Sequence, residues 1–391
     1  MKYIELFAGC GGLSVGLESL DYKLIFANEI SPMASETYAY NLLKEDLKKL
    51  ADNKKIANKV IWISSQYTNN DLLTRLRENP KNFPKFKFDN SDLGTNLDDL
   101  KGKLIVGSIV ELNKYLKQNS NIIEDLKKEN IDLISGGPPC QSFSLAGLRE
   151  HNNNRNTLPM DFAELVGLVN PKVALLENVS GILRAFTLDE GKYYAWFEVC
   201  KAFASKGYYP LCLNINAKYA GAAQNRPRFI MIALREDIFK NLKSNLTNKK
   251  FTNILSTIET FYNREKSGKT TLPFEHIDFY DIEKHSDLFE DNILSPLFAY
   301  KDSNTWFSVQ DAIDDLKGSP LKGKKSAYVK LINKQFSNLK NTVVAHKFSD
   351  NHALRMNGPK VRMRFRLYQH LSKVVSIKSK KSIYKNVENF L

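Results

Sequence analysis

The stretch Tyr3-Ile-Glu-Leu-Phe-Ala-Gly-Cys-Gly-Gly12 decides how this chain begins to fold. Its apolar start predicts a short strand over Tyr3–Phe7, and its glycines predict a turn over Ala8–Gly12. Apolar residues at helical spacing predict a helix over Leu13–Leu20, and Tyr22–Ala27 is typical of a second strand. These elements form the opening unit of an open α/β sheet, whose ligands bind at the carboxyl ends of its strands.

The glycine turn suits a ligand without a pyrophosphate. Glycines let the backbone approach a ligand closely and direct N–H groups toward it. Ser14 stands where the third glycine of a G-x-G-x-x-G dinucleotide pattern would be. Glu29, just after the second strand, is suited to accept hydrogen bonds from ribose hydroxyls. The pattern favours a nucleoside cofactor without phosphates, although a purely structural strand-to-helix turn explains the glycines equally well.

The alternation of strands and helices continues along the chain. Residues 103–109 and 173–179 are continuous apolar runs, typical of strands buried on both faces. A crossover helix is predicted over 161–169, and further strands are predicted over 207–217 and 229–234. The sequence therefore predicts an α/β fold with a doubly wound, mostly parallel sheet and helices on both sides.

A second informative segment, Gly136-Gly-Pro-Pro-Cys-Gln-Ser-Phe-Ser144, follows the apolar run Ile131–Ser135. Proline cannot donate to a sheet ladder and restricts its own φ, so we expect a buried strand that stops abruptly. Cys140 would then lie on a stiff loop at the carboxyl end of a strand. A small buried cysteine in a tight turn is the alternative, but the prolines and the polar residues after Cys140 favour a nucleophile.

Charged residues mark two further strand ends. Glu177 ends the apolar run 173–179, and a carboxylate there is costly unless it is paired or functional. Arg226 and Arg228 flank Pro227 just before the strand 229–234. Surface cations are one reading of these arginines; together with Cys140 and Glu177 they favour an anion clamp.

Composition limits the class of protein. A chain of 391 residues with 42% hydrophobic content can bury a large core. The formal charge of +14 favours a polyanionic partner, although lysine-rich proteins without one are common. Four cysteines without CxxC spacing suggest neither a metal site nor a disulfide framework. The sequence has no signal-peptide layout and no membrane-spanning run, so we expect a cytoplasmic protein (bacterial cytosol or nucleoid) with no membrane partner.

The ordered blocks resemble one enzyme family. Phe7-Ala-Gly-Cys-Gly-Gly12, Glu29, the Pro-Pro-Cys segment, Arg155-Asn-Thr-Leu158, Glu177-Asn-Val179 and Gln224-x-Arg-x-Arg228 are similar, in this order, to the DNA (cytosine-5)-methyltransferases of bacterial restriction-modification systems. The resemblance covers roughly residues 1–235. It implies the methyltransferase Rossmann-like fold, S-adenosylmethionine as methyl donor, and a cytosine flipped out of double-stranded DNA as acceptor.

The resemblance also implies catalytic roles. Cys140 would add to carbon 6 of the cytosine, because carbon 5 alone is not nucleophilic enough to take a methyl group. Glu177 would supply a proton to ring nitrogen 3, and Arg228 would hold the carbonyl oxygen of the base and the glutamate. Arg226 would hold a phosphate of the extruded nucleotide. Gln141, Ser144 and Arg226 are the expected DNA contacts.

The cofactor site carried over from the family has one departure. Phe7 would lie against the adenine, Gly9 and Gly11 near the methionine part, Glu29 on the ribose, and Ile109, Pro139 and Leu158 as further walls. The family usually has Gly-Asp-Ile where this chain has Gly107-Ser108-Ile109. Ser108 can accept one hydrogen bond from the adenine amino group, but it lacks the carboxylate.

The domains are predicted from the same blocks. Residues 1–235 form the catalytic domain, with a solvated insertion at 41–100; residues 236–345 form a variable region; and residues 346–391 form a basic helical segment. The basic segment is either a solvated helix or a contact for the DNA backbone. No Gly-Asn pair occurs near the end, so we expect a split or truncated enzyme whose target-recognition domain and closing motif come from a second polypeptide.

Two other functions remain open at this point. The chain could be a catalytically impaired nucleic-acid-binding or regulatory subunit on the same fold, because fold alone does not give activity. It could also be a tRNA cytosine-5 methyltransferase with the same nucleophile. The joint presence of Cys140, Glu177 and Arg228 favours the DNA enzyme.

Overall fold

The structure is a computed structural model that describes residues 1–53, 55, 57–63, 93–139, 158–188, 191–269, 271–290, 292–313, 326–335, 337 and 358–374. Two compact units are present, one formed by Met1–Asp315 with Lys324–Ala345 and the other by Leu316–Gly323 with His346–Leu391. The first unit therefore includes most of the region 236–345 that the sequence sets apart from the catalytic domain. In the second unit the described residues form the helix α13 (Pro359–Val374).

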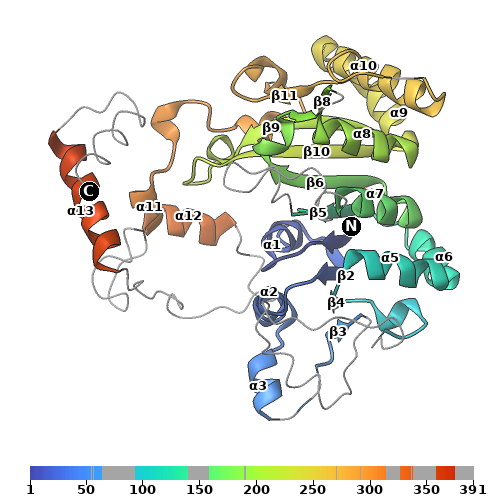
Figure 1. Cartoon of the computed structure of the whole chain (residues 1–391), viewed down its shortest axis with the longest axis horizontal. Coiled ribbons are helices and arrows are strands. Elements are labelled where there is room, and N and C mark those ends of the chain that lie inside the picture. The colour runs from blue at the N-terminus through green and yellow to red at the C-terminus, as the bar shows by residue number, and fades with distance from the viewer. Residues whose placement is uncertain are drawn as a thin grey trace. The chain divides into compact units, whose positions relative to one another are not determined.

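The described residues of the first unit build a nine-stranded sheet with helices on both faces (Figure 1). From one edge to the other, the strands are β3 (Val60–Trp62), β4 (Lys103–Val106), β2 (Lys23–Glu29), β1 (Lys2–Leu6), β5 (Leu133–Gly136), β6 (Val173–Val179), β10 (Pro227–Arg235), β9 (Tyr208–Asn216) and β11 (Phe279–Asp281). All neighbours pair in parallel except β10, which is antiparallel to both β6 and β9. The predicted mostly parallel, doubly wound sheet is confirmed.

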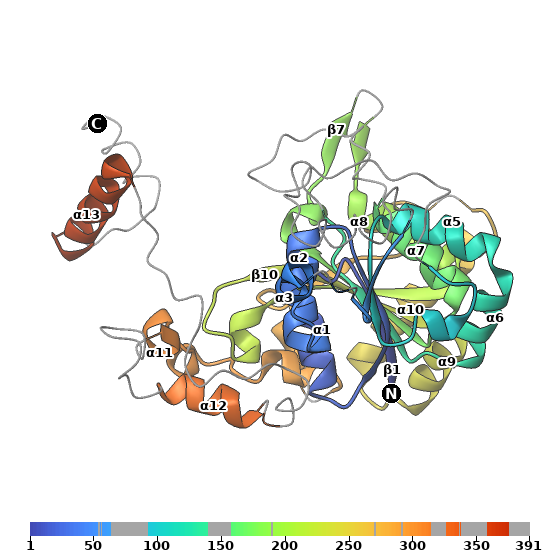
Figure 2. The same cartoon turned by 90° about the horizontal axis from the view of Figure 1, so that it is seen from below.

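Helices cover the two faces in separate groups (Figure 2). One group consists of α1 (Gly12–Glu18), α2 (Pro32–Tyr38), the π-helix Ala39–Leu43 and α3 (Leu47–Asp52). The other consists of α5 (Ile109–Gln118), α6 (Ser120–Lys128), α7 (Leu158–Val169), α8 (Ala195–Ser205), α9 (Glu236–Asn245) and α10 (Lys249–Lys266). Alternate residues of one strand serve both groups: Leu104 and Val106 pack in the core of the first group and Ile105 in the core of the second.

The first unit also contains shorter elements. These are the hairpin β7 (Phe186–Leu188) and β8 (Gly191–Tyr193), the short helices α11 (Val309–Ile313) and α12 (Ala327–Gln335), and 3₁₀ turns at Leu97–Asp99, Ser180–Leu183, Ala217–Ala220, Ser286–Phe289, Ser295–Phe298 and Ser303–Thr305. None of the described helices is long and apolar enough to cross a membrane.

The structure corrects one prediction about the segment after β2. The sequence predicts a solvated insertion over 41–100, but β3 lies within that range and pairs with β4. Trp62 of β3 is buried in the core beside α2. Part of the insertion is therefore an edge of the sheet, and residues 64–92 lie outside the described residues.

Candidate active site

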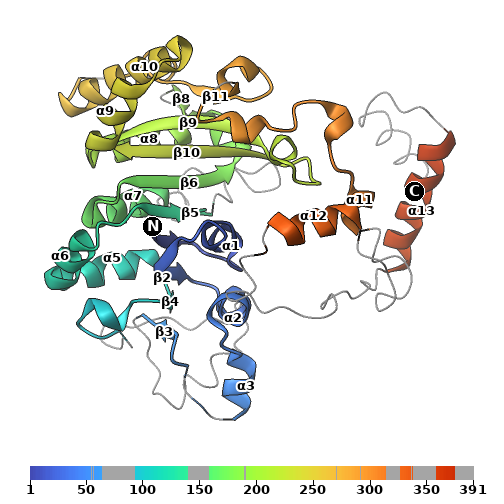
Figure 3. The same cartoon turned by 180° about the vertical axis from the view of Figure 1, so that it is seen from behind.

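The predicted site residues follow the carboxyl ends of neighbouring strands. Because β4, β2, β1, β5 and β6 run in parallel, the segments after them meet at one edge of the sheet (Figure 3). We call residues 7–12, 28–31 and 107–109 the glycine-loop side. We call residues 137–139, 177–179 and 226–228 the arginine side. The antiparallel strand β10 begins at this edge, which brings Arg228 to the end of β6, opposite Val179.

The glycine loop after β1 has a strained backbone. Phe7, Gly9 and Gly11 have φ values of 53°, 55° and 89°, all in the left-handed region. A Cβ atom at Gly11 would lie 2.5 Å from Leu42 Cδ1, so a side chain at this position would clash. At Gly9 no atom would lie within 4 Å of an added Cβ. Position 11 therefore needs glycine both for its left-handed φ and for lack of space, whereas position 9 needs it for its φ alone.

Glu29 lies at the end of β2 and is only 8% exposed. One carboxylate oxygen accepts from the Gly9 backbone N–H at 2.7 Å, and the other accepts from the Ser31 N–H at 2.8 Å. The predicted ribose-binding residue thus also holds the glycine loop in place. Each carboxylate oxygen has a second lone pair, so binding a hydroxyl remains possible in this arrangement.

The end of β4 is shaped by backbone and side-chain amides. Gly107 has a φ of 148°, and a Cβ there would lie 2.0 Å from Ile63 Cγ2. The buried Asn28 donates to the carbonyl oxygens of Ile105 and Gly107, both at 3.0 Å. Ser108 caps helix α5 and accepts from Val110 N–H at 3.2 Å. Ser108 therefore has a structural use that the sequence did not reveal.

Three expected walls of the cofactor site differ in exposure. Ile109 is 2% exposed and packs in the core, so little of its side chain is accessible to a ligand. Its backbone N–H lies in the first turn of α5, where amides have no partner within the helix. Leu158 is partly buried and Pro139 is exposed. Ile30, which the sequence analysis missed, is 53% exposed directly after Glu29 and offers an apolar surface there.

The arginine side contains an ion pair. Arg228 Nε lies 2.7 Å from Glu177 Oε1, and the two side chains are 19% and 30% exposed, respectively. The other carboxylate oxygen, Oε2, would lie 3.0 Å from a Cβ at Gly137. The pair of residues predicted to act on one base is therefore adjacent. Glycine at position 137 leaves space beside the second oxygen.

Asn178 has a structural role that the sequence analysis did not assign to it. It is buried, and its Nδ2 donates to the Pro138 carbonyl oxygen at 3.2 Å. Its Oδ1 accepts from the Val179 N–H at 2.8 Å. Asn178 thus ties the Gly-Gly-Pro-Pro segment to the strand that carries Glu177.

Several predicted residues remain less defined. Arg226 is exposed at the start of the β10 hairpin. Cys140, Gln141 and Ser144 lie outside the described residues, so their roles stay predictions. Among the described cysteines, Cys10 is exposed in the glycine loop, whereas Cys200 and Cys212 are buried with their Sγ atoms 3.3 Å apart. Among the described residues, no cluster of three or more His, Cys, Asp or Glu side chains could hold a metal ion.

A buried polar cluster lies beneath α1 on the glycine-loop side. Tyr3 and Tyr38 each lie 2.9 Å from Ser14 Oγ, and Ser14 also donates to Glu5. Burial raises the pKa of Glu5 from 4.5 to about 7, and neighbouring Glu18 and Glu29 add to this effect. Burial also raises the pKa of Tyr3 and Tyr38.

The two sides can do different chemistry. The glycine-loop side offers backbone N–H groups, one carboxylate and an apolar surface, which suits a nucleoside without phosphate groups. The arginine side offers a carboxyl group held by a guanidinium, which suits a heterocycle with a carbonyl oxygen and a ring nitrogen.

Comparison with known proteins gives a consistent result. The family model described as "C-5 cytosine-specific DNA methylase" matches residues 1–74 and 108–370. The Type II methyltransferase M.DdeI of Desulfomicrobium norvegicum is 29% identical over 237 residues, 61% of this chain and 41% of that protein. M.NgoPII of Neisseria gonorrhoeae, another Type II methyltransferase, is 30% identical over 239 residues, 61% of this chain and 49% of that protein.

A solved structure of the S. pombe Dnmt2 methyltransferase aligns at 17% identity with a TM-score of 0.32, covering 64% of this chain and 56% of that one. The chain spans about half the length of the curated relatives that it matches. The family model, in contrast, extends over most of this chain, from Met1 to within α13. This chain therefore belongs to the C-5 cytosine-specific DNA methylase family.

Proposed function

We propose that this chain transfers a methyl group to carbon 5 of a cytosine in double-stranded DNA, with S-adenosylmethionine as donor and Cys140 as nucleophile. The observation that carries the proposal is the Glu177–Arg228 pair, 2.7 Å apart at the end of β6, whose neighbour β5 leads to residues 137–139, directly before Cys140 in the sequence. Cytosine presents a carbonyl oxygen and a ring nitrogen side by side. A guanidinium and a protonated carboxyl group complement those two acceptors.

The residues divide the chemistry as follows. The Cys140 thiolate forms a bond to carbon 6, and the displaced electron pair moves into the ring. Glu177 delivers a proton to ring nitrogen 3, and we assign that proton to Oε2 because Arg228 holds Oε1. Bound S-adenosylmethionine supplies an electrophilic methyl group on a sulfonium. Once carbon 5 carries the methyl group, a base removes its proton, the Glu177 carboxylate takes the proton back from ring nitrogen 3, and the bond between the Cys140 sulfur and carbon 6 breaks to release the thiolate.

The glycine-loop side fits the proposed cofactor. Its left-handed backbone at Gly9 and Gly11 is compatible with close approach of a ligand. Glu29 is suited to the ribose hydroxyls, and the exposed Ile30 to one face of the adenine. The hydroxyl of Ser108 caps α5, so its hydrogen bond to the adenine amino group must come from its second lone pair.

The proposed acceptor is a base flipped out of the duplex, because a stacked cytosine cannot reach a nucleophile on a loop. Arg226, Gln141 and Ser144 would contact the DNA around it. The chain's net charge of +14 would favour binding to the phosphate backbone. Relatives named Type II methyltransferases support a role in restriction-modification.

Methyl transfer from labelled S-adenosylmethionine to genomic DNA and to tRNA tests the proposal. We expect label in DNA, loss of transfer in Cys140→Ser, and a stable covalent complex with DNA that carries 5-fluorocytosine at the target. Label in tRNA alone would establish the tRNA enzyme. A chain that binds DNA but transfers nothing would be a regulatory subunit.

Cofactor binding can be measured separately through Cys10. Cys10 is exposed in the glycine loop, and the other described cysteines are buried. In the Cys140→Ser variant, a thiol reagent should therefore modify Cys10 first, and S-adenosylmethionine should protect it. Protection without methyl transfer would separate cofactor binding from catalysis.

A second polypeptide that supplies a target-recognition domain remains a prediction. Adding such a polypeptide should raise site-specific methylation by this chain. Sequence-specific methylation at full rate by the 391-residue chain alone would contradict it.

A further inference from the structure

The arginines of the Gln-Asn-Arg-Pro-Arg segment lie where the backbone pairing is interrupted. Strands β9 and β10 form an antiparallel pair in which Asn216 is opposite Pro227. Proline has no N–H group, so this position cannot donate a backbone hydrogen bond to β9. Backbone pairing continues one residue earlier, where Ala217 N–H donates to the Arg226 carbonyl at 3.1 Å.

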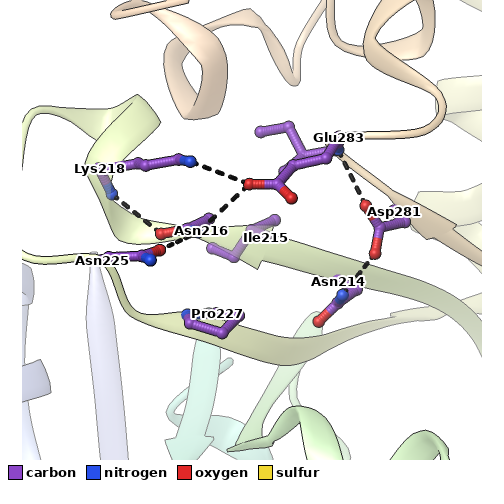
Figure 4. Close-up of a pocket in the computed structure, with 9 residues that line it drawn as sticks. Asn214, Ile215, Asn216, Lys218, Asn225, Pro227, Asp281 and Glu283 are labelled. Atoms are coloured by element: carbon purple, nitrogen blue, oxygen red, sulfur yellow. Dashed lines mark hydrogen bonds and ion pairs between the residues drawn. The ribbon is translucent and has the colours of Figure 1, made fainter. Parts of the chain in front are cut away.

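The side chain of Asn216 provides bonds at the interruption (Figure 4). Its Oδ1 accepts from the Arg226 N–H at 3.0 Å and from the Lys218 N–H at 3.4 Å. Its Nδ2 donates to Asn225 Oδ1 at 2.7 Å. Asn216 is only 5% exposed, so losing these bonds would leave buried polar groups without partners. One buried amide thus contacts both residues that precede Pro227.

Glu283 and the residues bonded to it support Asn216 from the β11 side. Glu283, just after β11, lies 3.5 Å from Asn216 Nδ2, 3.0 Å from Lys218 Nζ and 3.3 Å from the Tyr219 hydroxyl. Lys218 in turn lies 4.2 Å above the ring of Trp306. The segment after β11 is therefore joined to the end of β9 and to the turn that follows it.

Asn216, Lys218 and Glu283 line a cavity of about 310 Å³ at the ends of β9 and β11 (Figure 4). Binding of a ligand there is the alternative reading. Asn214 and Asp281 bond to each other at 2.6 Å, and Asn216 bonds to Asn225. Because the amides along the wall already bond to one another, the arrangement favours a brace over a binding site.

We propose that Asn216 is a positioning residue that sets the location of Arg226 and Arg228. The inference rests on the proposed function, because its purpose is to hold Arg228 at 2.7 Å from Glu177 when the base binds. A displacement of about 1 Å in such a site can lower the rate about 100-fold. Asn216 itself has no predicted contact with substrate or cofactor.

Amide hydrogen exchange tests the inference without requiring activity. In the full chain, Asn216→Ala should make the backbone amides of Lys218 and Arg226 exchange at least tenfold faster. Asn214→Ala is the matched control, because Asn214 lines the same cavity but bonds to Asp281 and Ser180. Asn216→Asp keeps an acceptor oxygen, so it should restore slow exchange at Arg226. Equal exchange in the two alanine variants would overturn the proposal.

Kinetics then distinguish positioning from general weakening of the fold. Asn216→Ala should lower kcat about 10- to 100-fold while leaving the KM for S-adenosylmethionine unchanged. In an Arg228→Ala background the same change should lower kcat much less, since the part of its effect that acts through Arg228 is already lost. An independent effect in both backgrounds would contradict the inference. Absence of methyl transfer by the unmodified chain would instead contradict the proposed function, even if the exchange result holds.

Discussion

The glycine-loop side and the arginine side lie at the same edge of one sheet, yet they are built differently. On the glycine-loop side, side chains such as Glu29 and Asn28 are bonded to the backbone of neighbouring loops. On the arginine side, two charged side chains form an ion pair. The first side presents a backbone shape held by polar side chains. The second presents reactive side chains held by buried amides.

The difference teaches what each side can tolerate. The glycine-loop side is shaped by its backbone. Its function therefore depends more on the glycine positions and their φ values than on any single charge. The Glu177–Arg228 pair acts through a few atoms, so replacing one carboxylate oxygen by an amide nitrogen can remove its function. Substitutions on the two sides should therefore affect different measured quantities: cofactor affinity on the first side and turnover on the second.

The largest effect is expected at Glu177. Glu177→Gln keeps the shape of the side chain but cannot deliver a proton to the ring nitrogen, so turnover should fall about 10²- to 10⁴-fold. Single-turnover methylation of DNA measures it. Protection of Cys10 by cofactor in the same variant should be unchanged. A rate near that of the unmodified chain would mean that this carboxyl group only forms part of the wall.

A smaller effect on turnover is expected at Gly137. A Cβ there would lie 3.0 Å from Glu177 Oε2, so Gly137→Ala should displace the carboxylate and lower turnover about tenfold. Gly16→Ala is the control, because no atom lies within 4 Å of its added Cβ. Equal rates for the two variants would show that the second oxygen needs no free space.

On the glycine-loop side, Gly11→Ala should weaken cofactor binding more than Gly9→Ala does. Both positions have a left-handed φ, which costs about 1 kcal/mol for alanine. Only Gly11 adds a clash, with Leu42 Cδ1 at 2.5 Å. Titration calorimetry with S-adenosylmethionine measures the two affinities. Turnover at saturating cofactor should remain similar in both variants; a large loss there would remove the distinction between the two sides.

An effect on stability rather than on the reaction is expected through Glu5. Its pKa of about 7 in the folded protein exceeds its ordinary value of 4.5, because burial disfavours the charged form. The folded state therefore retains a proton that the unfolded state releases, and stability falls as pH rises through this interval. Glu5→Gln should remove the penalty and gain about 3 kcal/mol at pH 8.

Measuring Tm at several pH values provides the control for Glu5→Gln. The difference in Tm between variant and unmodified chain should be near zero at about pH 4.5 and should grow toward pH 8. A difference independent of pH would assign the effect to packing around Ser14 and Tyr38 rather than to the charge.

Much of the fold follows from the sequence because parallel strands have a clear signature. Continuous apolar runs ending in glycine or a charged residue located β1, β4, β5 and β6, and with them one edge of the sheet. That edge also brought Glu177 and Arg228 into one site. Their contact follows from strand order, since β10 enters the sheet beside β6.

The remainder depends on contacts that the sequence does not show. The three-residue strands β3 and β11 are too short for a periodic pattern, and they join the sheet through their neighbours. Ser108 caps a helix whose start was predicted as strand, because the run 103–109 continues with apolar Ile109. Asn178 and Asn216 act through distant backbone partners, so spacing along the chain gives no sign of them.

The short outer strands also bear on how the protein behaves at high concentration. An edge strand exposes unpaired N–H and C=O groups, which can recruit another chain and start aggregation. Here both outermost strands of the described sheet, β3 and β11, are three residues long. Each leaves only a short template for intermolecular pairing. The carboxyl ends of the parallel strands can thereby stay open for chemistry, while the outer strands offer little backbone for self-association.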